Sequence, residues 1–348
     1  MNDVPQTDRV ADGTLLGQDQ FRGMVAPGLP PKTARGGQPA YFSVWDIHAY
    51  YGESYIVQGV SFDIREGEII ALLGRNGAGK TSTLRALARV DSPTLKHGEI
   101  WLDHKPLHEM KAHEAARNGI GLVPEDDAVY GFLTGRGFVE YGARLAGVGS
   151  PSTAAAHAIT AVGMDEAAGR AISGYSKGMR QRIKVAGALV NDPEVLFLDE
   201  PLNGADPVQR VRLIELFHRL AAEGRTVVVS SHVLEEVEKM ASRVIAMVDG
   251  RLAAAGDSAA IRAAFTDIPY RVRIDSDEPR KLGSALLGRD VIRSVEVIDE
   301  TLHVQTDDLG DLGRLLPSLA QSLDIRLTTV QPEDLSLESV FRYLVHGR

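Results

Sequence analysis

A glycine-rich loop that ends in a lysine and a threonine carries the clearest chemistry in this sequence. The loop and the residue after it are Gly74, Arg75, Asn76, Gly77, Ala78, Gly79, Lys80, Thr81 and Ser82. An apolar run over residues 68–73 precedes it and leucines at helical spacing follow, which matches the strand, loop and helix of the pattern GxxxxGK[ST]. Backbone N–H groups of such a loop bind phosphate, Lys80 reaches the β- and γ-phosphates, and the Thr81 hydroxyl holds Mg²⁺. We therefore predict that the chain binds a nucleoside triphosphate.

Two carboxylates and a histidine follow later apolar strands. Asp199 and Glu200 end the run that begins at residue 194, and His232 follows the run over residues 226–230. We expect Asp199 to join the Mg²⁺ shell and Glu200 to act as general base or to orient the attacking water. His232 is expected near the γ-phosphate. A polar strand cap and a surface histidine are the alternatives, but the position of these residues downstream of a phosphate loop favours catalysis.

Composition limits the classes of function. The net charge is −9 with no long basic run, which argues against nucleic acid as the main partner. Arg180, Arg182 and Lys184 are interpreted as a solvated helix face. Cysteine is absent, so disulfides and Cys-based metal sites are excluded. No run of eighteen apolar residues and no signal-peptide pattern occur, so we expect a cytoplasmic protein that needs a partner for any membrane role.

The hydrophobic pattern predicts an α/β fold in several parts. Residues 1–40 are rich in proline and glycine and lack an apolar period, which indicates a disordered tail. Over residues 41–266, strands alternate with helices, as in a parallel sheet. Strands at 41–47 and 56–64, with a turn at 50–52 between them, are expected to form an antiparallel β edge.

Two further parts are predicted from the periodicity. Helices at 135–146, 152–162 and 177–190 form a helical insertion over about residues 128–190 of the α/β core. Residues 267–348 repeat strand, helix, strand, strand, helix, strand before a terminal helix at 337–344. That order predicts a small C-terminal α+β domain of the ferredoxin-like type.

The last helix of the insertion opens on a second candidate anion site. The segment reads Gly174-Tyr175-Ser176-Lys177-Gly178-Met179-Arg180-Gln181-Arg182. The Ser176 hydroxyl and the Gly178 N–H at a helix N-terminus favour an anion. No anion of the chain itself is available there, so a ligand carried by a second copy of the chain would satisfy it.

Together these motifs resemble the ATP-binding-cassette (ABC) ATPase family, over roughly residues 40–255. The resemblance is carried by the phosphate loop, the Tyr-Ser-Lys-Gly-Met segment, Leu198-Asp199-Glu200-Pro201, the loop Asn203-Gly204-Ala205-Asp206 and His232, in the family's order. It implies a P-loop NTPase core. The Ser-Lys-Gly-Met-Arg-Gln-Arg wording resembles the exporter-type branch, whose membrane partners are ABC-2 permeases.

The resemblance implies a head-to-tail homodimer that buries two ATP molecules. Each ATP would lie between Lys80 and Thr81 of one subunit and Ser176 and Gly178 of the other, with Asp206 coupling the two sites. Tyr51 is identified as the aromatic that stacks on adenine; an ordinary core tyrosine is the alternative. Stacking tolerates any base, so ATP rather than GTP follows from the family alone.

Glu125 departs from the family's pattern, which has glutamine at this position in contact with Mg²⁺ and water. A carboxylate binds metal but donates no hydrogen bond unless it is protonated. Similar Val-Pro-Glu wording occurs in branched-chain amino acid importers, which residues 51–94 also resemble. We interpret Glu125 as a working variant in the metal and cofactor site.

These observations predict the ATPase subunit of a membrane transporter, bound to the cytoplasmic face of the cell membrane. It would drive a separate transmembrane permease that docks on the helical insertion, and the signature wording and the ending at 336–341 favour export. The alternatives are a branched-chain amino acid import ATPase and, less favoured, a soluble ABC ATPase that acts on ribosomes or DNA. The transported substrate is set by the permease and cannot be inferred from this chain.

Overall fold

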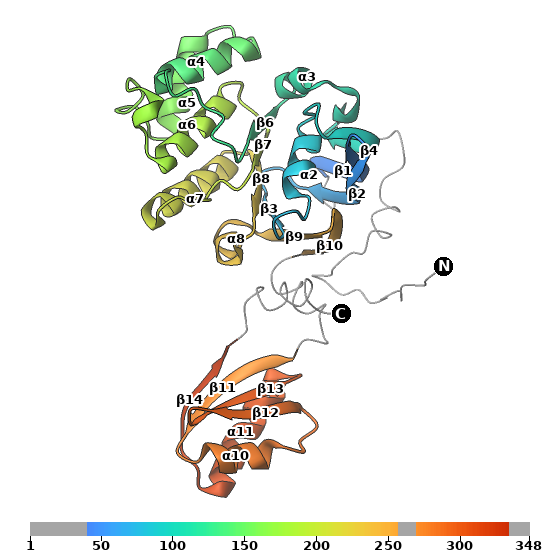
Figure 1. The fold of residues 1–348 in the computed structure, drawn as a ribbon, viewed down its shortest axis with the longest axis vertical. Coiled ribbons are helices and arrows are strands. Elements are labelled where there is room, and N and C mark those ends of the chain that lie inside the picture. Colours follow the sequence, from blue (N-terminus) through green and yellow to red (C-terminus); the bar gives the residue numbers. More distant parts are fainter. Residues whose placement is uncertain (1–39, 257–268, 334–348) are drawn as a thin grey trace. The chain divides into compact units, whose positions relative to one another are not determined.

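The computed structural model describes residues 40–256 and 269–333, which form two compact units (Figure 1). Nearly all of the predicted tail over 1–40, the terminal helix at 337–344 and the ending at 336–341 lie outside the described residues. No helix within 40–256 or 269–333 is long and apolar enough to cross a bilayer.

A six-stranded sheet forms the centre of the larger unit, in the order β10-β9-β3-β8-β7-β6. Its strands are β3 (Ile69–Leu73), β6 (Ile120–Val123), β7 (Val195–Leu198), β8 (Thr226–Ser231), β9 (Arg243–Val248) and β10 (Arg251–Gly256). All pairs are parallel except β9 with β10. Every residue of β3, β7 and β8 is buried, which explains why these strands read as continuous apolar runs. Their carboxyl ends meet at one edge, where ligands of such sheets bind.

The antiparallel β edge forms a second sheet, in the order β2-β1-β4-β5. Its strands are β1 (Phe42–Tyr51), β2 (Ser54–Ile64), β4 (Thr94–Leu102) and β5 (Lys105–Pro106). The turn expected at 50–52 is formed by Gly52 and Glu53 instead, because β1 continues to Tyr51, which pairs with Ser54. The Tyr50 and Tyr55 rings stack across the two strands at 4.6 Å and hold this register.

Seven α-helices of the described larger unit surround the sheets. They are α2 (Lys80–Leu87), α3 (Ala112–Arg117), α4 (Gly135–Ala146), α5 (Pro151–Ala161), α6 (Lys177–Leu189), α7 (Pro207–Ala222) and α8 (Leu234–Met240); the short turns η2 (Leu107–Glu109) and η3 (Ile172–Gly174) complete the set. Helices α4, α5 and α6 pack together as the predicted insertion (Figure 1). The buried Val139, Ile159 and Ile183 belong to the core that unites them. The predicted α/β class with a helical insertion is confirmed.

The smaller unit is an antiparallel sheet with two helices. Its elements are β11 (Tyr270–Ser276), α10 (Pro279–Leu286), β12 (Ile292–Ile298), β13 (Thr301–Thr306), α11 (Leu309–Leu323) and β14 (Leu327–Pro332), with strand order β12-β13-β11-β14. Buried Ile274, Leu282 and Leu316 join sheet and helices in one core. The element order is the one expected from the sequence; the ferredoxin-like classification stays a prediction.

Candidate active site

The phosphate loop connects β3 to α2 and brings Lys80 back over its own backbone. Gly77 and Gly79 have φ of 86° and 99°, which glycine adopts without steric cost. No side chain caps α2 at Gly79, so its first-turn N–H groups are available to an anion. The Lys80 side chain is buried, and its Nζ donates to the carbonyl oxygens of Gly74 at 2.7 Å and Arg75 at 3.3 Å.

Glu200 lies between Lys80 and His232. Its Oε1 is 3.1 Å from Lys80 Nζ, and its Oε2 is 2.9 Å from His232 Nδ1. The side chain is only 7% exposed, and the lysine compensates the buried negative charge. Glu200 has a φ of 45°, and its N–H donates to Ser230 Oγ at 2.8 Å. This turn directly after β7 directs the carboxylate toward the phosphate loop.

Thr81 and Asp199 meet beside this ion pair. Thr81 Oγ1 donates to Asp199 Oδ1 at 3.2 Å, and Ser230 Oγ donates to the same oxygen at 2.6 Å. Burial raises the pKa of Asp199, the nearby carboxylates of Glu125 and Glu200 add to the rise, and the two hydroxyl hydrogen bonds oppose it. Adjacent hydroxyl and carboxylate oxygens are the ligands that Mg²⁺ prefers. The residues therefore fit a magnesium ion.

Ser230 is a site residue that the sequence analysis missed. It accepts from the Glu200 N–H and donates to Asp199, so it joins the ends of β7 and β8. The signal was a hydroxyl residue near the end of a buried strand, two residues before His232.

Glu125 lies in a loop whose backbone carbonyls are hydrogen-bonded by Lys184. Glu125 Oε1 accepts from Asn203 Nδ2 at 3.1 Å. Lys184 Nζ donates to the backbone oxygens of Pro124, Glu125 and Asp126 at 2.8, 3.2 and 2.7 Å. Burial lowers the Lys184 pKa, while the acidic side chains of this loop oppose the change.

The interpretation of Arg180, Arg182 and Lys184 as a solvated face is wrong. Lys184 is only 6% exposed, and the two arginines donate to the backbone oxygens of Tyr175 and Gly163. Each of the three cations donates to a backbone carbonyl oxygen outside α6, so together they connect α6 to the adjacent loops.

Ser176 and Asp206 cap neighbouring helices. Ser176 Oγ accepts from the Met179 N–H at 3.3 Å at the start of α6, and Asp206 Oδ1 accepts from the Gln209 N–H at 2.9 Å at the start of α7. Gly178 packs so closely on Gln209 that an added Cβ would lie 2.8 Å from its Cγ. Within the described residues, no hydrogen bond or ion pair joins Ser176 or Gly178 to the phosphate loop.

Tyr51 and Tyr50 have different surroundings at the end of β1. Tyr50 stacks on Tyr55 and lies 4.5 Å beneath Lys96 Nζ, whereas Tyr51 is 37% exposed. Among the residues in the structure, Tyr51 makes no ring contact. Of the two neighbouring tyrosines, Tyr51 is therefore the one available for stacking on a base.

Sequence comparisons place these motifs among known proteins. The model of the family described as ABC transporter matches residues 57–203. YxlF of Bacillus subtilis (strain 168), an uncharacterized ABC transporter ATP-binding protein, is 31% identical over 88% of this chain and 99% of its own length. The Nod factor export ATP-binding protein I of Paraburkholderia xenovorans (strain LB400) is 31% identical over 82% of this chain and 95% of its own.

Solved structures share the fold over more than six-tenths of this chain. The dimeric bacterial ABC transporter cassette MJ0796 matches with a TM-score of 0.55 and 24% identity, over 62% of this chain and 98% of that one. The cbiO1 subunit of the cbiONQ transporter complex of Clostridium perfringens matches with a TM-score of 0.58 and 24% identity. The match covers 64% of this chain and 91% of cbiO1.

Proposed function

This chain belongs to the ABC transporter family as one of its ATP-binding proteins, and we propose that its ATPase site is built by Lys80, Thr81, Asp199 and Glu200. The observation that carries the proposal is their convergence at one sheet edge. Lys80 Nζ lies 3.1 Å from Glu200 Oε1, and Thr81 Oγ1 lies 3.2 Å from Asp199 Oδ1. One site thus combines a phosphate-binding cation, oxygen ligands for a metal and a carboxylate for water.

The binding roles follow from chemistry. Lys80 and the first-turn N–H groups of α2 bind the phosphates, while Thr81, Asp199 and Glu125 hold Mg²⁺. When bound, Mg²⁺ neutralises charge that develops on the phosphate oxygens. Tyr51 stacks on the adenine.

The hydrolytic role belongs to Glu200. Its carboxylate accepts a proton from the attacking water, and His232, bonded to Oε2, keeps it oriented. Lys80 pairs with Oε1 of the same carboxylate. A bound γ-phosphate competes with Glu200 for Lys80, because it carries more negative charge than one carboxylate. When Lys80 pairs with the phosphate, Glu200 Oε1 is free to accept the proton of the water.

A second copy of the chain completes the site in this proposal. Ser176 and Gly178 of one subunit face the phosphates bound at Lys80 of the other, and Asp206 couples the two sites. The side-by-side packing of Gly178 and Gln209 supports this, because it puts both segments on one surface. The dimeric MJ0796 cassette supports the same assembly.

A transmembrane permease is the proposed partner, bound at the helical insertion on the cytoplasmic face of the membrane. Exposed aromatic rings gather there: Tyr130 is 49%, Phe132 83% and Tyr141 46% exposed. The centroid of the Tyr130 ring lies 5.8 Å from that of Phe132 and 6.3 Å from that of Tyr141, so the three rings form one apolar patch. Such a patch is typical of a protein-binding surface.

Export of the ABC-2 type is the proposed direction of transport. The relative from Paraburkholderia is named as a Nod factor export protein, which supports this branch over amino acid import.

The test is Glu200→Gln in the full chain. We expect turnover to fall by roughly 10²–10⁴-fold, the usual contribution of a positioned general base. ATP binding should persist, since Lys80 and the loop remain. Phosphate release and equilibrium binding of a fluorescent ATP analogue measure the two effects. Glu223→Gln, at an exposed ion pair with Arg225, is the matched control and should hydrolyse at the parental rate. Parental turnover in Glu200→Gln would refute the assignment.

A further inference from the structure

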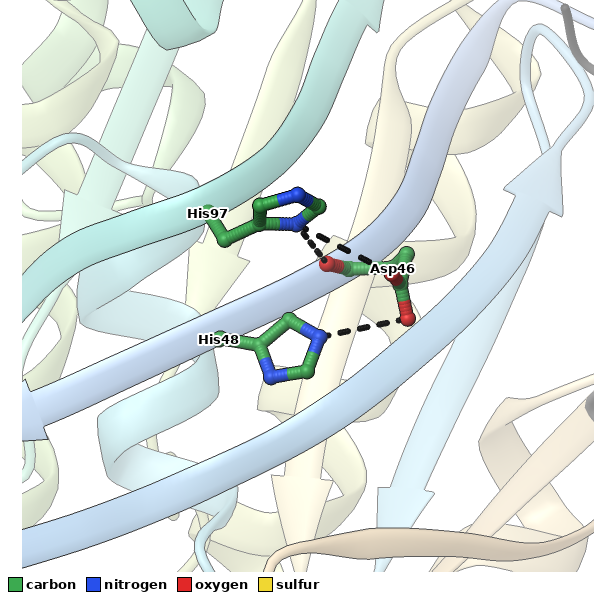
Figure 2. A group of neighbouring side chains, drawn as sticks. All are labelled: Asp46, His48 and His97. Carbon is green, nitrogen blue, oxygen red and sulfur yellow. Dashed lines mark hydrogen bonds and ion pairs between the residues drawn. The ribbon is translucent and has the colours of Figure 1, made fainter. Parts of the chain in front are cut away.

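Two histidines and an aspartate meet on the antiparallel sheet, apart from the residues assigned to the ATPase site. Asp46 and His48 belong to β1 and His97 to β4, and Figure 2 shows both imidazole rings beside the Asp46 carboxylate. One ligand atom from each residue can be chosen so that all three lie within 4.8 Å of one another. We propose that these three side chains bind one divalent transition-metal ion of the zinc, nickel or copper class.

The separations suit such an ion with small adjustments. His48 Nε2 lies 3.2 Å from Asp46 Oδ1, and His97 Nδ1 lies 3.8 Å from Asp46 Oδ2. Zinc binds imidazole nitrogen and carboxylate oxygen at about 2.0–2.2 Å, so two ligands of a tetrahedral ion lie about 3.3 Å apart. The His97 side chain is 63% exposed and can close the remaining gap by rotating.

A distortion of the backbone holds the aspartate in place. Asp46 has a φ of 46°, its N–H donates to Ser61 Oγ at 2.8 Å, and the register of β1 shifts around it. The opposite residue on β4 is Gly98, where an added Cβ would lie 2.4 Å from the Asp46 backbone oxygen. The glycine therefore permits the close approach that puts His97 beside Asp46.

A hydroxyl orients the first histidine. Tyr55 Oη bonds to His48 Nδ1, and the two rings stack with centroids 5.6 Å apart. This leaves His48 Nε2 as the atom that faces the carboxylate. Metal-binding histidines almost always have the second ring nitrogen hydrogen-bonded in this way. Tyr55 belongs to β2, a strand that carries none of the three proposed ligands.

The charges and the access route are compatible with a cation. Asp46 supplies one negative charge, and two neutral imidazoles are the ligands that zinc, nickel and copper favour. Arg251 is the neighbouring cation, and its Nε donates to Gln58 Oε1 at 3.0 Å. Asp46, His48, Tyr55 and Arg251 line a pocket of about 190 Å³, which gives room for a water ligand beside Asp46 and His48. His97 does not line this pocket, but its side chain is 63% exposed and is reached directly from solvent.

Calorimetric titration of Zn²⁺ into the full chain tests the proposal. The protein is prepared without a polyhistidine tag, nucleotide or Mg²⁺. We expect one equivalent of Zn²⁺ to bind. His97→Ala, His48→Ala and Asp46→Asn should each weaken binding by more than about tenfold, and Tyr55→Phe by about tenfold, as an orienting partner does. His104→Ala is the matched control, because His104 is 81% exposed and also lies beside an aspartate, at 3.3 Å.

Cobalt binding, followed by visible absorption, provides a second measurement. Visible absorption of tetrahedral Co²⁺ should appear in the parent and in His104→Ala and disappear in His97→Ala. Because His97 is largely exposed, that variant should retain the fold, which far-UV circular dichroism checks. Parental Zn²⁺ affinity in both His48→Ala and His97→Ala would overturn the proposal and leave a surface ion pair only. Equal weakening in His104→Ala would overturn it as well.

Discussion

The buried pair of Lys80 and Glu200 links the two halves of the proposed chemistry at the scale of single residues. Lys80 also donates to two loop carbonyls, so the loop and the carboxylate are held by one ammonium group. Removing one partner of a buried pair leaves an uncompensated charge. Glutamine at position 200 keeps a carbonyl oxygen for Lys80, so Glu200→Gln removes the general base without leaving the ammonium group unpaired.

Glu125→Gln tests whether Glu125 does the same work as the glutamine that the ABC family has at this position. Glutamine keeps a carbonyl oxygen that can accept the Asn203 hydrogen bond, now 3.1 Å long, and adds a donor. We expect ATPase activity equal to or higher than that of the parent, measured by phosphate release at saturating ATP. Loss of activity in this variant would show that the carboxylate itself is required and that our interpretation is wrong.

Asp199→Asn tests the effect of burial on that carboxyl. Its pKa is raised mainly by burial, so the folded state holds its proton to a higher pH than the unfolded state does. The stability it contributes is present below the unfolded pKa of about 3.9 and is lost as the pH rises through the folded pKa. Without nucleotide or Mg²⁺, Asp199→Asn should therefore have a higher melting temperature than the parent near neutral pH. This difference in melting temperature should become smaller as the pH is lowered.

Thermal unfolding followed by circular dichroism across a pH series measures this difference. Asp192→Asn, at a side chain that is 85% exposed, controls for the loss of one surface charge. A melting temperature of Asp199→Asn below the parent's across the whole series would contradict the expected trend.

At the scale of elements, the site depends on where strands end and on what holds the next loop. Buried β7 and β8 are parallel neighbours, so Asp199, Glu200 and Ser230 come together at their carboxyl ends. Helix α6 adds the second support, because Lys184 near its middle binds three carbonyl oxygens of the loop that carries Glu125. The helical insertion and the sheet are therefore joined next to the residues proposed to bind the metal.

Lys184→Met should weaken the contact between α6 and the loop that carries Glu125. The change removes a charged donor that makes three partly buried hydrogen bonds to backbone carbonyls, and it keeps most of the side-chain volume. We therefore expect the free energy of unfolding to fall by about 2–3 kcal/mol. Urea unfolding followed by circular dichroism measures it. Lys239→Met, at an exposed lysine, should stay within about 0.5 kcal/mol of the parent. Equal stability of the two variants would show that Lys184 is not a structural support.

At the scale of the whole molecule, the proposed ATPase works only as a pair of chains. Ser176 is the N-cap of α6, so its replacement could act through the helix rather than through a partner's nucleotide. Aspartate is as good an N-cap as serine, but its charge repels phosphate. The variant Ser176→Asp therefore separates the two roles.

In the Glu200→Gln background, ATP should convert the protein to a dimer, and Ser176→Asp should prevent this. Light scattering after size-exclusion chromatography with ATP measures the mass, and the melting temperature without ATP checks the helix. Ser150→Asp, at the N-cap of α5, adds the same charge elsewhere in the insertion and should leave dimer formation intact. Dimers of undiminished amount in Ser176→Asp would refute a trans contact at this residue.

The sequence by itself determined the parts that depend on local pattern. The phosphate loop, the carboxylates after β7 and the bounds of α4 follow from spacing and periodicity within one element, which do not depend on contacts with the rest of the chain. The order of the motifs likewise led to the ABC transporter family, which the comparisons confirm.

Only the tertiary structure decided which residues that are distant in the sequence lie next to one another. It put Ser230 between Asp199 and Glu200, buried Lys184 against a loop some sixty residues away, and set Tyr51 apart from the stacked Tyr50. It also brought His97 to Asp46 through strand register and a distortion opposite a glycine. Burial, register and helix packing depend on contacts between elements, and no local pattern of residues records them.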